Sequence, residues 1–161
     1  MKNVLILLVL LLSPPLFAEK AQQFSIEQTV TRLPVEEDVS ADDVRDSLQS
    51  KAAELNMKLV AHQPVSDELR ARGVESGVLE IFQFCNPGDA RKMVDFNMIF
   101  AAYMPCRIAM VEDDQGKLWL MMINLDMLIN STPLPADVLA IAQKVNDILT
   151  EIIEAGAAGD F

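Results

Sequence analysis

The feature that most constrains the fold is a pair of apolar runs separated by a short acidic turn. Residues 105–112 (PCRIAMVE) and 117–124 (KLWLMMIN) are rich in strand-forming side chains, and residues 113–116 between them read Asp-Asp-Gln-Gly. Such runs joined by so short a loop predict a β-hairpin. A third run, residues 78–85 (VLEIFQFC), precedes the hairpin. The chain is therefore expected to build an antiparallel sheet.

Helical patterns alternate with these strands along the rest of the chain. The expected elements are a strand in residues 24–35, a helix over 41–55 capped by Ser40, a strand at 57–62, the strand at 78–85, a helix over 89–96, the hairpin, and a last helix that follows residue 135. This β-α-β-β-α-β-β-α order is dominated by hairpin-like steps. It predicts the α+β class, with an antiparallel sheet of about five strands and helices on one face.

The N-terminus has the pattern of a secretory signal peptide. Lys2 supplies the positive charge, residues 4–12 form an apolar run of nine, and Pro14-Pro15 and Ala18 suit a cleavage site. An uncleaved anchor is disfavoured, because a membrane-spanning helix needs about 20 apolar residues. We expect cleavage and a periplasmic or otherwise secreted protein.

The remaining chain is expected to contain one domain. Residues 19–39 form an N-terminal segment with the first strand, residues 40–155 form the domain, and residues 156–161 form a tail in which Gly156 and Gly159 end the last helix.

Composition narrows the classes of partner. The chain carries 24 acidic and 13 basic residues, for a net charge of −11, while 51% of its residues are hydrophobic. A nucleic-acid binder would carry a basic footprint, and an anionic membrane surface would repel this chain. We expect a globular protein with no nucleic-acid partner and no stable membrane insertion after cleavage of the signal peptide.

Two motifs resemble a known family. Residues 82–95 (FQFCNPGDARKMVD) combine a strand end with an Asn-Pro step and a short helix, and residues 104–120 begin with Met-Pro-Cys and continue into the hairpin. In these features the chain resembles the bacterial domain of unknown function 302. The resemblance implies a compact α+β fold, described as TBP-like, that often forms a dimer. It implies no activity, substrate or cofactor that could be transferred to particular residues.

Cys85 and Cys106 are the most informative single residues. Cys85 ends one predicted strand and Cys106 begins the next, so antiparallel pairing would bring them together. In an oxidising compartment a disulfide is expected, with a stabilisation of about 3 kcal/mol in the chain-entropy model. Two alternatives stay open. The thiols are buried and free, packing as small apolar groups, or they form a redox or metal pair, although no Cys-x-x-Cys motif is present.

Four residues beside the cysteines are candidates for ligand binding. Asn86 and Pro87 follow the first cysteine, and Pro105 and Arg107 flank the second. Arg107 has the opposite sheet-face parity from the cysteine before it, so it could meet an anionic ligand beside Asn86. The alternative is an ordinary exposed strand arginine.

No pattern typical of a catalytic, metal or cofactor site is present in the sequence. There is no Gly-x-Ser-x-Gly and no phosphate-binding glycine loop, and His62 is the only histidine. The chain has nine methionines, of which Met1 belongs to the leader. Seven fall within apolar elements, show no Met-x-x-Met repeat and are expected to fill the core: Met93, Met98, Met104, Met110, Met121, Met122 and Met127. We expect no catalytic residue, no metal and no cofactor.

These observations favour a secreted, non-enzymatic binding or interaction module that forms a homodimer. Trp119, Met121 and Phe82 on a sheet face would suit a partner or a pocket. The alternative is a soft-metal or thiol-redox protein that uses Cys85 and Cys106. An uncharacterised hydrolase or isomerase is a third hypothesis.

Overall fold

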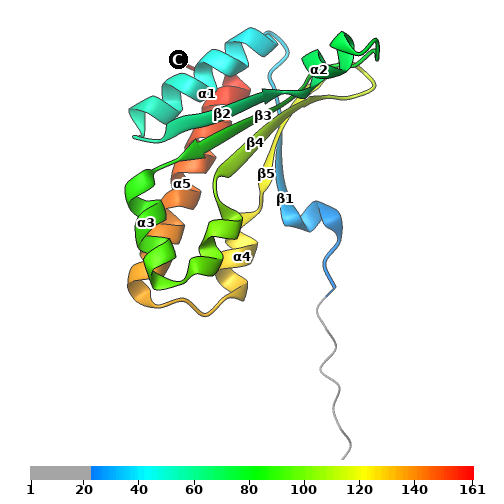
Figure 1. Cartoon of the computed structure of the whole chain (residues 1–161). Helices are drawn as coiled ribbons and strands as arrows, with labels where there is room; N and C mark the ends of the chain where they lie inside the picture. The colour runs from blue at the N-terminus through cyan, green and yellow to red at the C-terminus, as the bar shows by residue number, and fades with distance from the viewer. Residues whose placement is uncertain (1–22) are drawn as a thin grey trace, which may run out of the picture.

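The computed structural model describes residues 23–161, and the predicted signal peptide lies outside the described residues. Five strands form one antiparallel sheet in the order β1-β5-β4-β3-β2 (Figure 1). They are β1 (Val30–Pro34), β2 (Lys58–Pro64), β3 (Leu79–Cys85), β4 (Cys106–Glu112) and β5 (Leu118–Ile123). The predicted α+β class and antiparallel sheet are confirmed.

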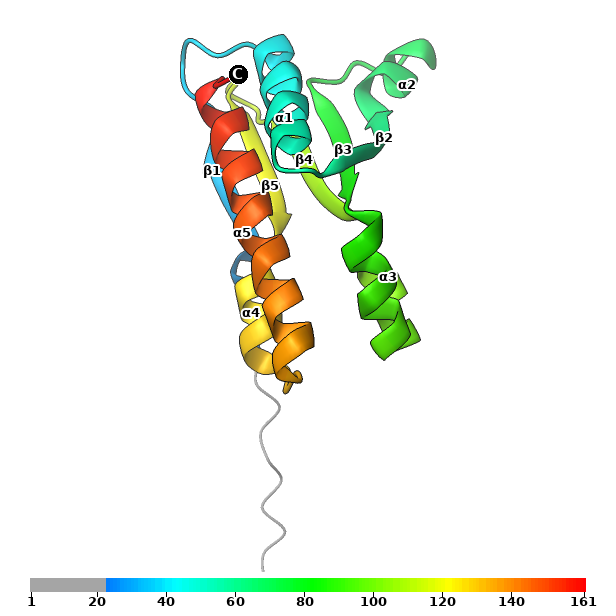
Figure 2. The same ribbon diagram turned by 90° about the vertical axis from the view of Figure 1, so that its left-hand side faces the viewer.

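Helices cover one face of the sheet and extend from its two ends. The long helices α1 (Ala41–Glu54) and α5 (Ala136–Ala158) lie side by side across one face (Figure 2). The shorter helices are α2 (Val65–Ala71) at one end, and α3 (Pro87–Phe96), the 3₁₀ helix η2 (Met98–Tyr103) and α4 (Leu125–Ser131) at the other end. Within residues 23–161, no helix is both long and apolar enough to span a membrane.

The core lies between the sheet and the two long helices. The register pairs Phe82 with Ile108 and Ile108 with Met122, so these side chains share the covered face. Leu48 of α1 and Ile152 of α5 are fully buried against them. Burial of each such side chain contributes about 1.5–3 kcal/mol, and this layer therefore accounts for much of the stability.

The opposite face of the sheet is more open. Trp119 and Met121 are half-buried there, and the Arg32 guanidinium lies 4.3 Å from the centre of the Trp119 ring. Phe82, expected to share a partner surface with them, instead faces the helices and is fully buried. The reason is strand parity, because the apolar residues of β3 point to both faces.

Local capping explains the start and end of α1. The Ser40 hydroxyl accepts a hydrogen bond from the Asp43 backbone N–H, and the Asp43 side chain accepts one from the Ser40 N–H. Asn56 follows the helix at φ 58°, the left-handed conformation expected for this position. The predicted helix over residues 41–55 is confirmed to within one residue.

The N-terminal boundary of the domain needs correction. A 3₁₀ helix, η1 (Ile26–Thr29), replaces the first half of the predicted strand, and the Ser25 N–H donates to Gln28 Oε1 at 2.9 Å. The strand that follows, β1, pairs with β5 at the sheet edge. The domain therefore includes this strand and does not begin at residue 40.

The predicted C-terminal tail is also wrong. Helix α5 continues through the buried Gly156 to Ala158, and Gly159 ends it at φ 71°. A Cβ at residue 156 would lie 2.5 Å from Leu48 Cδ2. Gly156 is therefore a contact point between helices, where the absence of a side chain permits close approach.

Candidate functional site

A cavity of about 450 Å³ lies at the end of the sheet where β3 finishes and β4 begins. Its floor is Phe84, Cys106 and Met57, and its walls come from α3 with η2 on one side and from α4 with the first half of α5 on the other. Most lining side chains are aliphatic or aromatic. A volume of this size falls within the range of roughly 300–1,000 Å³ typical of small-molecule sites.

Asn86 fixes the N-terminal end of helix α3. Asn86 accepts a hydrogen bond from the Asp89 N–H at 3.1 Å and donates from Nδ2 to the Asn56 carbonyl at 3.1 Å. Pro87 occupies the first helical position, where its missing N–H costs nothing. The helix predicted over residues 89–96 is present and begins two residues earlier, at Pro87.

An ion pair between the buried Asp89 and the half-exposed Lys144 ties α3 to α5 beside the cavity. Lys144 Nζ donates to Asp89 Oδ2 at 2.7 Å, and Lys92 Nζ lies 3.6 Å from the other carboxylate oxygen. The Lys144 contact holds the pKa of Asp89 below its ordinary value, although burial acts in the opposite direction. The one carboxylate of the cavity wall is therefore neutralised by α5.

The remaining walls were not predicted from the sequence. Asn97 caps η2 by accepting the Ile99 N–H at 3.0 Å, and Asn124 caps α4 by accepting the Met127 N–H at 3.0 Å. Residues 98–104 and 125–131 are short apolar runs without clear periodicity, which sequence patterns cannot assign. The asparagine before each run is the residue from which a helix start could have been predicted.

Aromatic side chains line the η2 wall. The rings of Phe96 and Phe100 are 6.2 Å apart, and those of Phe100 and Tyr103 are 6.4 Å apart. All three side chains line the cavity. Their contacts join α3 to η2 as one aromatic wall.

The two cysteines carry free thiols, so the predicted disulfide is not formed in the structure. The register pairs Cys106 with Phe84, which places Cys85 one residue further along β3. Successive side chains alternate between faces, so Cys85 and Cys106 leave their strands in opposite directions. The prediction that these two strand ends lie together is correct, but the residue-by-residue register could not be predicted from the sequence.

Burial makes both thiols weak acids. Burial raises the pKa of Cys85 above its ordinary value, and burial together with the nearby Cys85 raises the pKa of Cys106 to about 11. Reactive cysteines need a lowered pKa, because the thiolate is the nucleophile. Both cysteines are partly buried and free, which is closest to the alternative in which they pack as small apolar groups.

The four predicted ligand-binding residues do not converge. Asn86 lines the cavity, but both ends of its amide are used to hold α3. Pro87 and Pro105 are not among the lining residues, and the Met104–Pro105 peptide bond is cis. Arg107 is exposed and pairs with Gln83, so its parity turns it to the open face of the sheet. Strand parity directs the Arg107 side chain away from Asn86. Ligand binding at these four residues stays a prediction.

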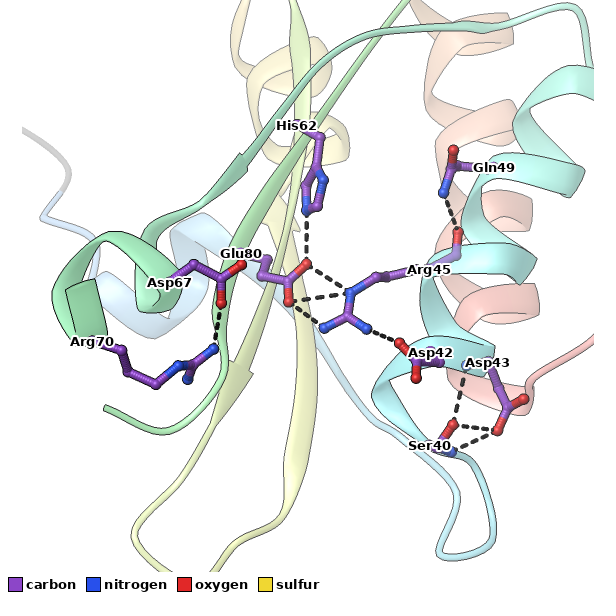
Figure 3. Close-up of polar contacts among 9 residues, drawn as sticks. All are labelled: Ser40, Asp42, Asp43, Arg45, Gln49, His62, Asp67, Arg70 and Glu80. Carbon is purple, nitrogen blue, oxygen red and sulfur yellow. Dashed lines mark hydrogen bonds and ion pairs between the residues drawn. The ribbon is translucent and has the colours of Figure 1, made fainter. Parts of the chain in front are cut away.

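A polar cluster that sequence reasoning missed lies at the other end of the covered face (Figure 3). Glu80 of β3 is only 3% exposed, and its carboxylate accepts hydrogen bonds from Arg45 Nε at 3.0 and 3.2 Å. His62 Nε2 lies 2.7 Å from Glu80 Oε2, and the His62 ring stacks on Phe82 at 4.5 Å. The sequence feature that could have indicated this cluster is the glutamate within an otherwise mostly apolar predicted strand.

Arg45 dominates the electrostatics of this cluster. Its hydrogen bonds lower the pKa of Glu80, burial raises it, and the hydrogen bond with His62 lowers it, with a net shift below the ordinary value of 4.5. The Arg45 side chain also pairs with the exposed Asp42 one turn earlier on α1. The cluster links α1 to β2 and β3.

Sulfur donors are unusually frequent around the cavity. Met57, Met93 and Met104 line it together with the two cysteines. Within the described part of the chain, however, no three histidine, cysteine or carboxylate side chains gather as metal ligands. Met57 and Met93 are buried between the sheet and the helices, whereas Met98, expected to fill the core, is 78% exposed.

Comparison with known proteins identifies the family. A family model described as "Domain of unknown function DUF302" matches residues 31–156. The chain belongs to this family. The match includes β1 and most of α5, in agreement with the corrected domain boundaries. No match was found among curated proteins.

A solved structure of a DUF302 protein has the same fold. It is an uncharacterized conserved protein from Bacillus stearothermophilus with a TM-score of 0.67 and 17% sequence identity. The alignment covers 79% of this chain and 97% of that chain. At this identity, the similarity establishes the shared fold alone.

Proposed function

We propose that this DUF302 protein is a small, non-enzymatic binding protein that holds an apolar or amphipathic small molecule in the cavity. The observation that carries the proposal is the cavity itself, about 450 Å³ in volume and lined mainly by apolar side chains. Its one carboxylate is paired with lysine, and its thiols are weak acids, so the lining offers little for polar or covalent recognition. Binding would depend chiefly on removal of apolar surface from water.

A cavity-filling substitution tests this proposal. The Ala142→Phe variant places a ring in the cavity wall and is expected to lower the affinity for 1-N-phenylnaphthylamine, a fluorescent apolar probe, by at least tenfold. Ala140→Phe puts the same ring on the exposed side of the same helix and is expected to bind as the unmodified protein does. Equal binding by both variants, or no binding by the unmodified protein, would contradict the proposal.

The cysteines are expected to be present as two free thiols. Because the pKa of Cys106 is raised to about 11, its alkylation by iodoacetamide at pH 8 should be far slower in the native than in the denatured protein. Intact mass after denaturation without reductant should show two adducts. A species with no adducts that gains two after reduction would establish the disulfide instead.

The soft-metal or thiol-redox alternative is less well supported. Five sulfur-containing side chains line the cavity, which favours soft-metal binding, but the raised pKa values of Cys85 and Cys106 oppose thiolate chemistry. Replacement of both cysteines by serine distinguishes the two functions. Binding of the apolar probe should survive this change, whereas metal uptake or redox activity would be lost.

We further propose that the protein acts outside the cytoplasm, on the basis of its leader sequence, and that it forms a homodimer. The open sheet face with Trp119 and Met121 is the surface we assign to the dimer. Size-exclusion chromatography with light scattering is expected to give twice the monomer mass. A strict monomer at high micromolar concentration would contradict the dimer.

A further inference from the structure

We infer that the end of the molecule around the cavity docks on a lipid surface with electrically neutral headgroups, from which the cavity takes its ligand. This inference rests on the proposed function and names the source of the apolar molecule. It assigns a role to α3, η2 and the connection from α4 to α5, which together surround the cavity.

Two uncharged segments meet at this end. Residues 96–106 and residues 127–136 contain no aspartate, glutamate, lysine or arginine, in a chain in which 23% of residues are charged. Both lie at the end of the sheet opposite α2 in two perpendicular views (Figures 1 and 2). Each also lines the cavity, the first through Phe100 and Met104 and the second through Ile129 and Leu134. The cavity is therefore bordered from both sides by uncharged chain.

Exposed apolar side chains concentrate in the first segment. Of the ten large hydrophobic side chains exposed in residues 23–161, four fall within residues 96–103, and Met98 and Ile99 are 78% and 65% exposed. Phe96 and Tyr103 are about half exposed and also line the cavity. Apolar side chains presented to solvent with a tyrosine beside them are typical of surfaces that enter the interfacial region of a bilayer.

Charge decides the kind of lipid. The charged residues that immediately flank the two segments are Asp95, Arg107, Asp126 and Asp137, and the nearby Arg91, Lys92 and Lys144 are paired with Asp95 and Asp89. This end therefore has no surplus of basic residues, and both segments lack a polybasic patch of the kind that binds anionic headgroups. Anionic lipid would repel the chain as a whole, which carries a net charge of −11. Neutral, zwitterionic headgroups add no such repulsion, and apolar contact alone can then drive transient docking.

The test compares vesicle binding among matched variants. Sedimentation with phosphatidylcholine vesicles should recover the unmodified protein, and the double variant Met98→Asp with Ile99→Asp should bind at least tenfold more weakly. Val74→Asp makes a similar change at an exposed apolar residue beyond α2 and is expected to bind normally. All variants carry the same N-terminus, so any contribution from the leader is common to them.

Other outcomes separate this inference from the proposed function. Ala142→Phe should bind vesicles normally while binding the apolar probe at least tenfold more weakly, because residue 142 lies in the cavity wall. Ile99 lines the cavity as well as being exposed, so Met98→Asp alone, outside the cavity lining, should weaken vesicle binding and leave probe binding unchanged. Probe binding without any vesicle binding would overturn the docking and leave the proposed function intact. Preference for phosphatidylglycerol vesicles would overturn it in favour of electrostatic attraction. Conversion of a dimer to a monomer by the double variant would show that a second copy occupies this end.

Discussion

The Arg45→Ala variant is expected to lose about 2–3 kcal/mol of unfolding free energy at neutral pH, measured by urea denaturation. The residue left behind, Glu80, is only 3% exposed and would keep His62 as its remaining partner in the cluster. Without the guanidinium, the buried carboxylate keeps its desolvation cost and loses the charged hydrogen bonds that offset that cost. Because the Arg45 side chain is itself 29% exposed, we expect a smaller loss of unfolding free energy than for breaking a fully buried ion pair.

The loss is expected to depend on pH. In the unmodified protein the pKa of Glu80 lies below its ordinary value of 4.5, so the unfolded chain binds more protons as pH falls through 4.5. The cluster therefore contributes its stability above pH 4.5 and loses it below. In Arg45→Ala the largest influence that lowers the pKa of Glu80 is lost, while burial still raises it and His62 still lowers it. The deficit should therefore be largest at neutral pH and should shrink as the carboxyl becomes protonated.

Two control variants locate the effect at Glu80. Asp42→Ala removes the exposed partner of Arg45 and is expected to change stability little. Arg45→Ala combined with Glu80→Gln removes the unpaired charge and should recover part of the loss, with a flatter pH dependence. A deficit in Arg45→Ala that stays constant from neutral pH to well below pH 4.5 would contradict the role assigned to the buried carboxylate.

Features encoded by neighbouring residues could be predicted from the sequence. The hairpin follows from its turn, the start of α1 from Ser40 and Asp43, and the start of α3 from Asn86 and Pro87. Each depends on contacts between residues a few positions apart, where propensity and capping decide the conformation. The family resemblance rests on the same local motifs.

The candidate site depended on contacts between distant residues and could not be predicted in this way. Strand parity decided three outcomes: Glu80 turns into the core, Arg107 turns away from Asn86, and the two cysteines diverge. A shift of one residue in register would reverse all three outcomes. Because β3 has apolar side chains at adjacent as well as alternate positions, its sequence does not indicate which face of the strand is buried. The cavity requires in addition the placement of η2 and α4, which have no periodic pattern.

The Gly156→Ala variant is expected to destabilise the protein by about 2 kcal/mol, although the same change in an exposed helix interior stabilises by about 1 kcal/mol. Residue 156 lies in the buried side of α5, where an added Cβ would be 2.5 Å from Leu48 Cδ2 and 3.0 Å from Leu120 Cδ1. Relief requires either a change of Leu48 rotamer or separation of α1 from α5. Both disturb side chains that are fully buried in the core.

A double-mutant cycle separates this contact from a general effect of the substitution. Leu48→Ala alone should cost about 2–5 kcal/mol, but it removes the two atoms that lie closest to the new Cβ, Leu48 Cδ2 and Cγ, and leaves Leu120 Cδ1 room to shift. Gly156→Ala in that background should therefore be neutral or stabilising, with a coupling energy of about 2 kcal/mol between the two sites. Glu154→Ala, at an exposed position of the same helix, controls for helix propensity and should change stability by less than about 0.5 kcal/mol. An equal cost of Gly156→Ala in both backgrounds would show that the close approach of α5 to α1 does not require a glycine.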